Sequence, residues 1–414
     1  MILIYRLLIN LVLVFSPLIV LIRLIKKKEH FTRFKEKFTL FSKKRNKGKL
    51  VWFHGASVGE LVSVIPLIEK LEKKKNINQI LVTTSTLSSA KIFTKFKFKK
   101  TVHQFFPLDT NYLSKKFINY WKPNLAIFID SEIWPNMLTN LKKNNINHVL
   151  LNARITKKTF KRWKWFGTFS KKLFQSFNFV YPQNEETLKY LNKFEVKKIK
   201  KLGNLKFSES VLDSKEIINR NLKKFLKNKK YWCAASTHDG EEFIAANAHK
   251  AIAKKFDNLI TIIIPRNIQR TEKIIDTLSK LGLKTFLHSL DKKIPKDTQV
   301  YIVDTYGETK PFFKICKIVF LGKSLSVSGG QNPLEPARYN CNIIHGPKVS
   351  NFPEIYNLLD KSKISFKVSN QSQLIKKINE LFKKNIRSKY TGNKIKRMGQ
   401  KILNKTMSEL EKVI

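Results

Sequence analysis

Two glycine-containing segments follow strand-like runs, one in each half of the chain: HGASVGE at residues 54–60 and SVSGGQNPLEPA at residues 326–337. Glycine allows the backbone to approach a ligand closely, and the free amides of a helix start attract an anion. Each segment would lie at the carboxyl edge of a parallel sheet. Two such edges that face each other are typical of a cleft for a nucleotide-linked sugar.

Glu60 closes the first segment and falls in the first turn of the predicted helix. The helix dipole favours the carboxylate form there, and a carboxylate at the mouth of a cleft can act as general base for a hydroxyl group. Acidic residues also cap helices, so this segment alone leaves both roles open. We expect His54 to be a structural or orienting residue, since no second metal ligand follows at helical or strand spacing.

Four more charged residues follow predicted strands in the first half. Asp130 and Glu132 are two apart in IDSEIWPN, which we expect to be an extended loop that projects both toward similar sides. There they could orient a sugar or share a cation. Arg154 in NAR and Lys206 in GNLKF could pair with a phosphate or a carboxylate, and a surface salt bridge is the alternative for each.

The second half contains the better candidates for nucleotide contacts. STHDGEE at residues 236–242 is typical of a capped helix start. Arg266 follows a buried strand, where its fork of donors can hold a phosphate or a pyrimidine edge. Glu308 lies beside a glycine turn in VDTYGE. We expect Pro333 at a first helical position and Glu335 in the first turn, within reach of ribose hydroxyls.

Short apolar runs alternate with amphipathic stretches, which is typical of α/β units with parallel sheets. The predicted strands are Leu50–Phe53, Gln79–Thr84, Leu125–Ile129, His148–Leu151, Tyr231–Ala235, Leu259–Ile264, Gln299–Val303, Ile318–Leu321 and Asn342–Ile344. Residues 207–230 are the predicted joint between the halves, and one helix is predicted over 396–414. The sequence therefore predicts an α/β protein of two Rossmann-like domains with a cleft between them.

The first 22 residues contain one charge, Arg6, in an otherwise apolar stretch close to the length of a membrane span. Basic residues follow it, whereas a cleaved signal would begin with its charges. We therefore expect an uncleaved anchor with the body in the cytoplasm. Pro17 and the length also allow a half-inserted, monotopic helix, and a buried first helix is the structural alternative.

The formal net charge of +51 suggests nucleic acid, an anionic membrane surface or an acidic substrate. The lysines are spread along the sequence rather than clustered in blocks, and no helix-turn-helix, RNP or zinc-finger pattern is present. A nucleic-acid-binding protein is therefore disfavoured. Cations alternate with aromatic residues in 93–100 and 157–172, which fits either a membrane-facing surface or solvated lysines beside core aromatics. Three scattered cysteines argue against a disulfide framework or a zinc site.

The succession HGASVGE, DSEIWPN, NAR, GNLKF, STHDGEE, IIIPR, VDTYGE, GGQNPLEPA and HGPKVSNF resembles the 3-deoxy-D-manno-octulosonic acid (Kdo) transferases, in order and spacing, over nearly the whole chain. The resemblance implies an inverting, metal-independent glycosyltransferase of GT-B type, with no cofactor, at the cytoplasmic face of the inner membrane. It would move Kdo from the substrate CMP-Kdo to the lipid A precursor lipid IVA, with inner membrane lipids and no nucleic acid as partners. The implied domains are an anchor (1–28), an acceptor domain (29–206), a CMP-sugar domain (207–395) and a C-terminal helix (396–414).

The resemblance also implies roles for individual residues. The general base falls on Glu60, while Asp130 and Lys206 match positions that stabilise the transition state, with Glu132 as an orienting group. The donor-binding positions are Pro265, Arg266, Tyr306, Gly307, Glu308, Asn332, Pro333, Leu334 and Glu335. Candidate acceptor or phosphate contacts are Ser57, Arg154 and Ser324. No residue is assigned to a metal.

This chain departs from the family pattern at four positions. Asp130 replaces the first of two glutamates, and Asn267 and Gln331 each replace a histidine. Lys323 stands where the family has the second glycine of GGS. The nearest rival interpretation is a related GT-B enzyme that uses another nucleotide sugar.

Overall fold

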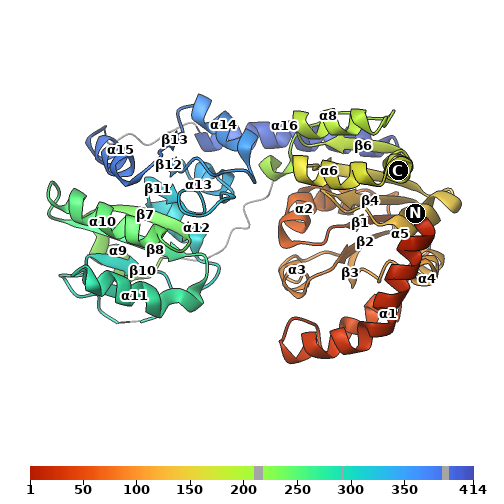
Figure 1. Cartoon of the computed structure of the whole chain (residues 1–414), viewed down its shortest axis with the longest axis horizontal. Helices are drawn as coiled ribbons and strands as arrows, with labels where there is room; N and C mark the ends of the chain where they lie inside the picture. Colours follow the sequence, from red (N-terminus) through yellow and green to blue (C-terminus); the bar gives the residue numbers. More distant parts are fainter. Residues whose placement is uncertain (209–217, 291, 385–390) are drawn as a thin grey trace. The chain divides into compact units, whose positions relative to one another are not determined.

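The computed structural model describes residues 1–208, 218–290, 292–384 and 391–414. Residues 209–217, part of the predicted joint, lie outside these ranges. The chain divides into two compact units, the first comprising Met1–Val211 with Met398–Ile414 and the second Leu212–Arg397. Each unit contains a parallel β-sheet flanked by helices (Figure 1), so the predicted α/β class is confirmed.

The six-stranded sheet of the first unit has the order β3-β2-β1-β4-β5-β6. Its strands are β1 (Leu50–His54), β2 (Gln79–Thr84), β3 (Thr101–Phe105), β4 (Leu125–Ile129), β5 (Asn147–Ala153) and β6 (Phe179–Pro182). Its helices are α1 (Ile2–Ile25), α2 (Val58–Glu72), α3 (Leu87–Phe93), α4 (Asn111–Trp121), α5 (Pro135–Lys143), α6 (Lys157–Trp165), α7 (Thr168–Phe174) and α8 (Glu185–Lys193), with 3₁₀ turns η1 (Arg33–Phe38) and η2 (Leu205–Ser208). The strand order reverses between β1 and β4, which opens a crevice at their carboxyl ends.

The first sheet is buried on both faces because its strands are apolar at nearly every position. Val51 and Phe53 of β1 belong to one core cluster, and Leu50 and Trp52 belong to the other. Alternate side chains of a strand point to opposite faces, so β1 contributes to both layers. This rigid strand fixes the position of the loop that follows it.

The predicted C-terminal helix begins earlier than residue 396, as α16 (Thr391–Glu411). From Met398 onward it belongs to the first unit, where Leu403, Met407 and Leu410 are buried in the core beside α2. The core of the first unit is therefore built from two segments that are far apart in sequence.

The seven-stranded sheet of the second unit has the order β13-β12-β11-β7-β8-β10-β9. Its strands are β7 (Lys230–Thr237), β8 (Leu259–Pro265), β9 (Thr285–Leu287), β10 (Val300–Ile302), β11 (Ile318–Leu321), β12 (Asn342–His345) and β13 (Ser365–Lys367). Its other elements are α9 (Arg220–Leu226), α10 (Glu241–Ala253), η3 (Ile268–Arg270), α11 (Thr271–Lys280), α12 (Thr309–Ile315), α13 (Leu334–Arg338), α14 (Pro353–Lys361) and α15 (Gln371–Lys384). Here the order reverses between β7 and β11.

All nine predicted strands are present, and the described ranges contain four more that the sequence interpretation missed. The missed strands β3, β6, β9 and β13 are the four edges of the two sheets. An edge strand pairs on one side only and can be short, so its sequence need not form an apolar run.

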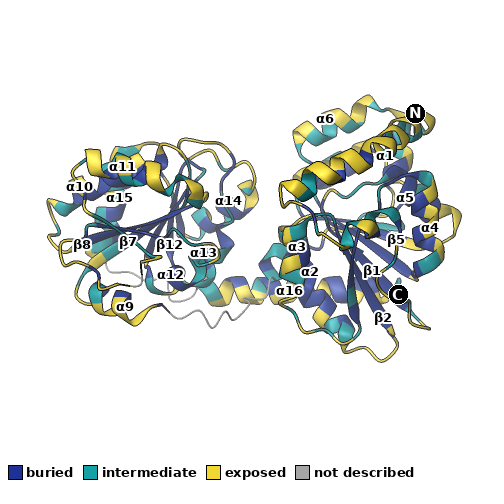
Figure 2. Ribbon diagram, turned by 90° about the horizontal axis from the view of Figure 1, so that it is seen from below, coloured by how far each residue is buried: buried dark blue, intermediate teal, exposed yellow. Residues whose placement is uncertain are grey.

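Helix α1 is the one helix among the described residues that is long and apolar enough to cross a membrane. In Figure 2 it is coloured mostly as exposed, in contrast to the buried strands. Of its residues only Ser16 and Val20 are buried, so α1 is not the core helix that was the structural alternative.

Candidate active site

Glu60 lies in the first turn of α2, just beyond the end of β1. Its carboxylate accepts hydrogen bonds from the backbone amides of Ala56 (2.6 Å) and Ser57 (3.3 Å) and from the Ser57 hydroxyl (2.8 Å). Ser57 in turn accepts from the Glu60 amide, which completes a capping box. The predicted capping role is thus confirmed. A carboxylate has about four lone-pair sites, so capping leaves room to accept a proton.

The surroundings of Glu60 raise the pKa of its carboxyl group above the ordinary value. Burial is the main cause, and the negative charges of Glu132 and Asp130 add to it, while the Ser57 hydrogen bonds act in the opposite direction. A carboxylate with a raised pKa binds a proton more tightly than an ordinary one. This property suits a general base.

Glu132 is held in place by two side chains: His54 Nε2 lies 3.0 Å from its Oε2, and the Trp134 indole N–H donates to the same oxygen at 2.8 Å. His54 is itself fixed, since its Nδ1 lies 3.0 Å from the Thr83 hydroxyl and its ring stacks on Phe106 at 3.8 Å. Burial raises the pKa of Glu132, but the contacts with His54 and Trp134 together lower it by more. The net shift of the pKa is therefore downward. Both ring nitrogens of His54 face protein side chains, as expected of a structural or orienting residue.

Asp130 does not lie in the extended loop that we predicted. Its φ of 61° is left-handed, and the Glu132 amide donates to the Ile129 carbonyl at 3.3 Å, so the segment is a tight turn. Strand β4 ends at Ile129, and α5 begins soon after the turn, at Pro135. Even so, the negative charges of Asp130 and Glu132 both raise the pKa of Glu60, as expected of side chains that face the same region.

Lys206 and Arg154, the two basic residues predicted to contact anionic groups, lie near Asp130. Burial raises the pKa of Asp130, and the positive charges of Lys206 and Arg154 partly offset this rise. Arg154 is also tied to the turn through its backbone, since its amide donates to the Asp130 carbonyl at 3.0 Å. The first unit therefore brings Glu60, Asp130, Glu132, Arg154 and Lys206 together at the crevice between β1 and β4.

In the second unit a protein carboxylate lies at the equivalent position, where the strand order reverses between β7 and β11. Glu241 accepts backbone hydrogen bonds from Lys323 (2.7 Å), Ser324 (3.0 Å), Leu325 (3.1 Å) and His238 (2.9 Å). We predicted only a helix cap here, because sequence reasoning could not connect residue 241 with a loop that follows another strand.

Ser324, a candidate phosphate contact, is fully buried in this structure. Its amide donates to Glu241, and its hydroxyl donates to the Leu321 carbonyl at 2.6 Å and accepts from the Gly346 amide at 2.9 Å. These bonds direct its polar groups at the protein. The role that the contacts support is to hold the loop after β11.

Arg266 and Glu335 are brought together at the carboxyl edge of the second sheet. Burial raises the pKa of Glu335, while the charges of Lys310, Arg338 and Arg266 act to lower it. Arg266 is exposed, and its amide donates to the Thr237 carbonyl at 3.0 Å, next to the preceding strand end. A cation and a carboxylate side by side can bind a phosphate and a hydroxyl of one ligand.

The glycine-rich segment of the second half differs by one residue from the prediction. Pro333 is the N-cap of α13 rather than its first residue, and the Asn332 side chain accepts from the Leu334 amide at 3.1 Å. Such one-residue shifts are common at helix ends. Gly330 has a φ of 73°, and an added Cβ would lie 3.0 Å from the Val349 backbone, so this turn requires glycine.

The VDTYGE segment presents an exposed aromatic ring and a fixed carboxylate. Tyr306 is 67% exposed, and Gly307 has a φ of 90° with open space around it. Glu308 is held by His288 at 2.6 Å and by the Thr305 hydroxyl at 2.5 Å. The exposed ring is available to stack on a planar ligand.

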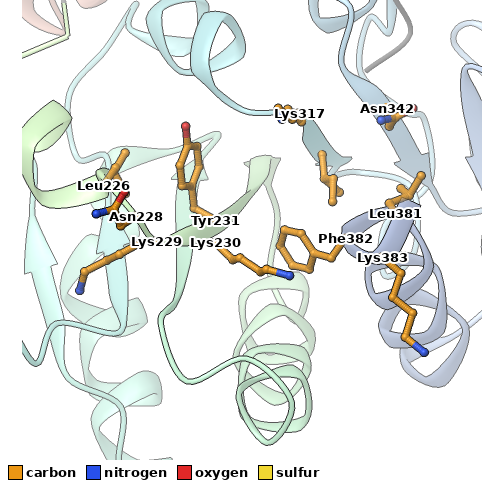
Figure 3. Close-up of a pocket in the computed structure, with 11 residues that line it drawn as sticks. Leu226, Asn228, Lys229, Lys230, Tyr231, Lys317, Asn342, Leu381, Phe382 and Lys383 are labelled. Atoms are coloured by element: carbon orange, nitrogen blue, oxygen red, sulfur yellow. The ribbon is translucent and has the colours of Figure 1, made fainter. Parts of the chain in front are cut away.

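A different cavity, of about 560 Å³, lies at the opposite edge of the second sheet (Figure 3). It is lined at the amino ends of β7, β11 and β12 by residues that include Lys230, Lys317 and Asn342. Ligands of open α/β sheets bind outside the carboxyl ends of the strands, so this cavity is not a candidate for the donor site. Within the described ranges, no three His, Cys, Asp or Glu side chains are grouped as metal ligands would be.

Solved structures with this fold include a glycosyltransferase from Rickettsia africae (TM-score 0.59, 11% identity, 89% of this chain and 99% of that one). A UDP-GlcNAc 2-epimerase from Neisseria meningitidis is similar as well (TM-score 0.58, 12% identity, 88% and 99%). Two parallel-sheet α/β units with such neighbours define the GT-B type of architecture.

The family follows from sequence relatives. The model of the family described as 3-Deoxy-D-manno-octulosonic-acid transferase (kdotransferase) matches residues 32–209. A 3-deoxy-D-manno-octulosonic acid transferase of Rickettsia bellii is 34% identical over 89% of this chain and 87% of its own length. That of Haemophilus influenzae is 27% identical over 88% and 85%. The chain belongs to the Kdo transferases, the glycosyltransferases that add Kdo in lipopolysaccharide synthesis.

Proposed function

We propose that the protein transfers Kdo from CMP-Kdo to lipid IVA with inversion at the anomeric carbon, and that Glu60 is the general base. The observation that carries this proposal is the placement of Glu60 at the β1–β4 crevice, with its pKa raised by burial and by two neighbouring carboxylates. In this reaction the acceptor hydroxyl attacks the anomeric carbon as Glu60 takes its proton. The bond from that carbon to the phosphate oxygen breaks, and CMP leaves.

The other charged residues of the first unit would serve the same step. Asp130 and Lys206, which lie close together, would stabilise the charge that develops at the reacting sugar. Glu132, fixed by His54, would orient the acceptor, and Arg154 would contact an anionic group. This assigns the acceptor to residues 29–206 and the donor to residues 207–395.

The donor would be held by the carboxyl edge of the second sheet. Pro265 and Arg266, the 306–308 turn and residues 332–335 would contact the CMP moiety, with Glu335 at the ribose hydroxyls. Arg266 and backbone amides would carry the charge of the leaving phosphate without a metal ion or cofactor. Helix α1 would anchor the protein at the inner membrane with its body in the cytoplasm.

The direct test is transfer of labelled Kdo from CMP-Kdo to lipid IVA by the purified protein, with products resolved by mass and the configuration of the new bond assigned by NMR. The proposal expects a product heavier by one or more Kdo residues, with the new bond of opposite anomeric configuration to the donor. Failure of a folded, CMP-binding protein to form product would contradict the proposed acceptor.

The pH dependence of the reaction should report the environment of Glu60. Because the base must be ionised, kcat/KM should fall as the pH drops through its raised pKa. Glu132→Gln removes a negative charge that raises this pKa, so the acid limb should move to lower pH. Initial rates measured across the acid limb for both proteins check the shift. An unchanged limb would show that another group controls it.

Arg266→Ala should weaken CMP binding by about tenfold to a hundredfold, since a charge-assisted contact to phosphate is lost. Isothermal titration with CMP measures the change. Arg270→Ala is the matched control, because Arg270 is paired with Glu242 at 3.0 Å. Equal affinities of the Arg266 variant and the wild type would remove Arg266 from the donor site.

A further inference from the structure

The amino end of α1 is fastened to the first unit. The Tyr5 hydroxyl donates to Asp109 at 2.8 Å, and Arg6 donates to Asn136 at 2.9 Å and to Asn111 at 3.1 Å. These partners lie at the start of α4 and α5, two helices that cover the sheet. If α1 spanned a membrane, its amino end would lie away from the body of the protein. Here that end is bound to the first unit.

The carboxyl end of α1 is fastened as well. Arg23 donates to Glu29 at 2.9 Å, and Lys37 of η1 donates to the same carboxylate at 2.7 Å. Arg33 of η1 then donates to the His103 carbonyl of β3 at 2.8 Å. With both ends held against one globular unit, α1 would lie in the plane of a membrane surface, with its exposed apolar side chains toward the lipid.

Helix α1 lies beside α6, as Figure 2 shows, and an apolar cavity of about 410 Å³ opens between them. The residues that line it are Met1, Ile4, Tyr5, Leu8, Ile133, Trp134, Pro135, Arg162, Trp163, Phe166 and Phe169. The Tyr5 hydroxyl already has a partner, and Arg162 carries the one charged side chain of the lining. Such a lining offers few partners to a peptide backbone, and it suits a hydrocarbon chain.

The cavity shares a wall with the candidate active site. Trp134 lines the cavity, while its indole N–H bonds to Glu132 at 2.8 Å and its ring packs on Phe106 with centroids 5.2 Å apart. The negative charge of Glu132 in turn raises the pKa of Glu60. A molecule with an apolar chain in the cavity would thus hold its polar part near the carboxylate cluster.

We propose that this cavity binds one acyl chain of the lipid acceptor, and that α1 is a wall of the acceptor site as well as an anchor. The inference rests on the proposed function. The occupant is the acceptor's own chain, because the cavity adjoins the carboxylates that would receive its hydroxyl. Each methylene group that enters the cavity adds to the binding of an acylated acceptor and does nothing for an acceptor without acyl chains.

Leu8→Trp is the test variant, because Leu8 lines the cavity and is 55% exposed, so the larger ring can enter without disturbing the core. We expect its KM for lipid IVA to rise about tenfold or more, equivalent to the loss of about two buried methylene groups. Its KM for the fully deacylated disaccharide bisphosphate should equal that of the wild type. Leu7→Trp is the matched control: Leu7 is 72% exposed and is not part of the lining.

Other outcomes would overturn the inference. An equal effect of Leu8→Trp on both acceptors would mean that the cavity does not recognise the chain. Weaker binding to phospholipid vesicles with an unchanged KM for lipid IVA would mean that a membrane lipid occupies the cavity instead.

A second readout is independent of turnover. A lipid IVA analogue with a photoreactive diazirine near the end of an acyl chain should label α1, residues 133–135 or residues 162–169 of the wild type. Leu8→Trp should reduce this labelling, and Leu7→Trp should not. Labelling elsewhere would overturn the inference even if the enzyme were inactive, whereas inactivity with labelling at the cavity would contradict only the proposed reaction.

Discussion

Glu60→Gln is expected to lower kcat for Kdo transfer by about a hundredfold to ten-thousandfold, the usual contribution of a general base. Glutamine retains an oxygen that can accept from the Ala56 and Ser57 amides, so the start of α2 should keep its cap. It cannot take the proton of the acceptor hydroxyl. Single-turnover transfer from CMP-Kdo to lipid IVA, measured with saturating substrates, isolates the chemical step.

Glu69→Gln is the matched control for this experiment, since Glu69 is an exposed glutamate on the same helix. It should transfer Kdo at the wild-type rate. A Glu60→Gln protein that is folded and turns over within a few-fold of the wild type would show that Glu60 serves as a cap and that another group is the base.

Glu241→Ala is expected to destabilise the second unit by on the order of 3 kcal/mol or more. The substitution leaves the amides of Lys323, Ser324, Leu325 and His238 without their acceptor, and a buried donor that loses its partner costs about 1–3 kcal/mol. For a unit of this size the unfolding temperature should fall by roughly 10 °C. Differential scanning calorimetry of the full chain measures the change.

Hydrogen exchange assigns this effect to the proposed contacts, because the amides of residues 323–325 should lose protection in Glu241→Ala before the rest of the sheet does. Glu241→Gln, with one acceptor oxygen, should lie between alanine and the wild type. Glu272→Gln, an exposed first-turn glutamate of α11, should unfold like the wild type. An unchanged unfolding temperature in the alanine variant would mean that water replaces the carboxylate.

The central strands were predictable because a strand buried on both faces must be apolar along its length, as Trp52 and its neighbours are. The edge strand β3 escaped prediction for the converse reason, since its TVHQF sequence carries His103 and Gln104. Local chemistry also identified the first turn of α2, where Ser57 and Glu60 have the spacing of a capping box.

Contacts between residues far apart in the chain could not be predicted from the sequence. His54 and Glu132 are 78 positions apart, and their bond depends on β1 and β4 being neighbours in a sheet whose order the sequence does not state. Glu241 and Lys323 are likewise 82 positions apart. The left-handed turn at Asp130 had no local signal, because aspartate is compatible with both extended and left-handed backbone.

The division of the first unit between the two ends of the sequence has a consequence for biosynthesis. Leu403, Met407 and Leu410 of α16 complete the core beside α2, yet the ribosome makes them after the whole second unit. Domains usually fold in the order of their synthesis. Here the second unit can complete its fold first. The first unit exposes apolar core surface until residues 398–414 have been synthesised and can pack beside α2.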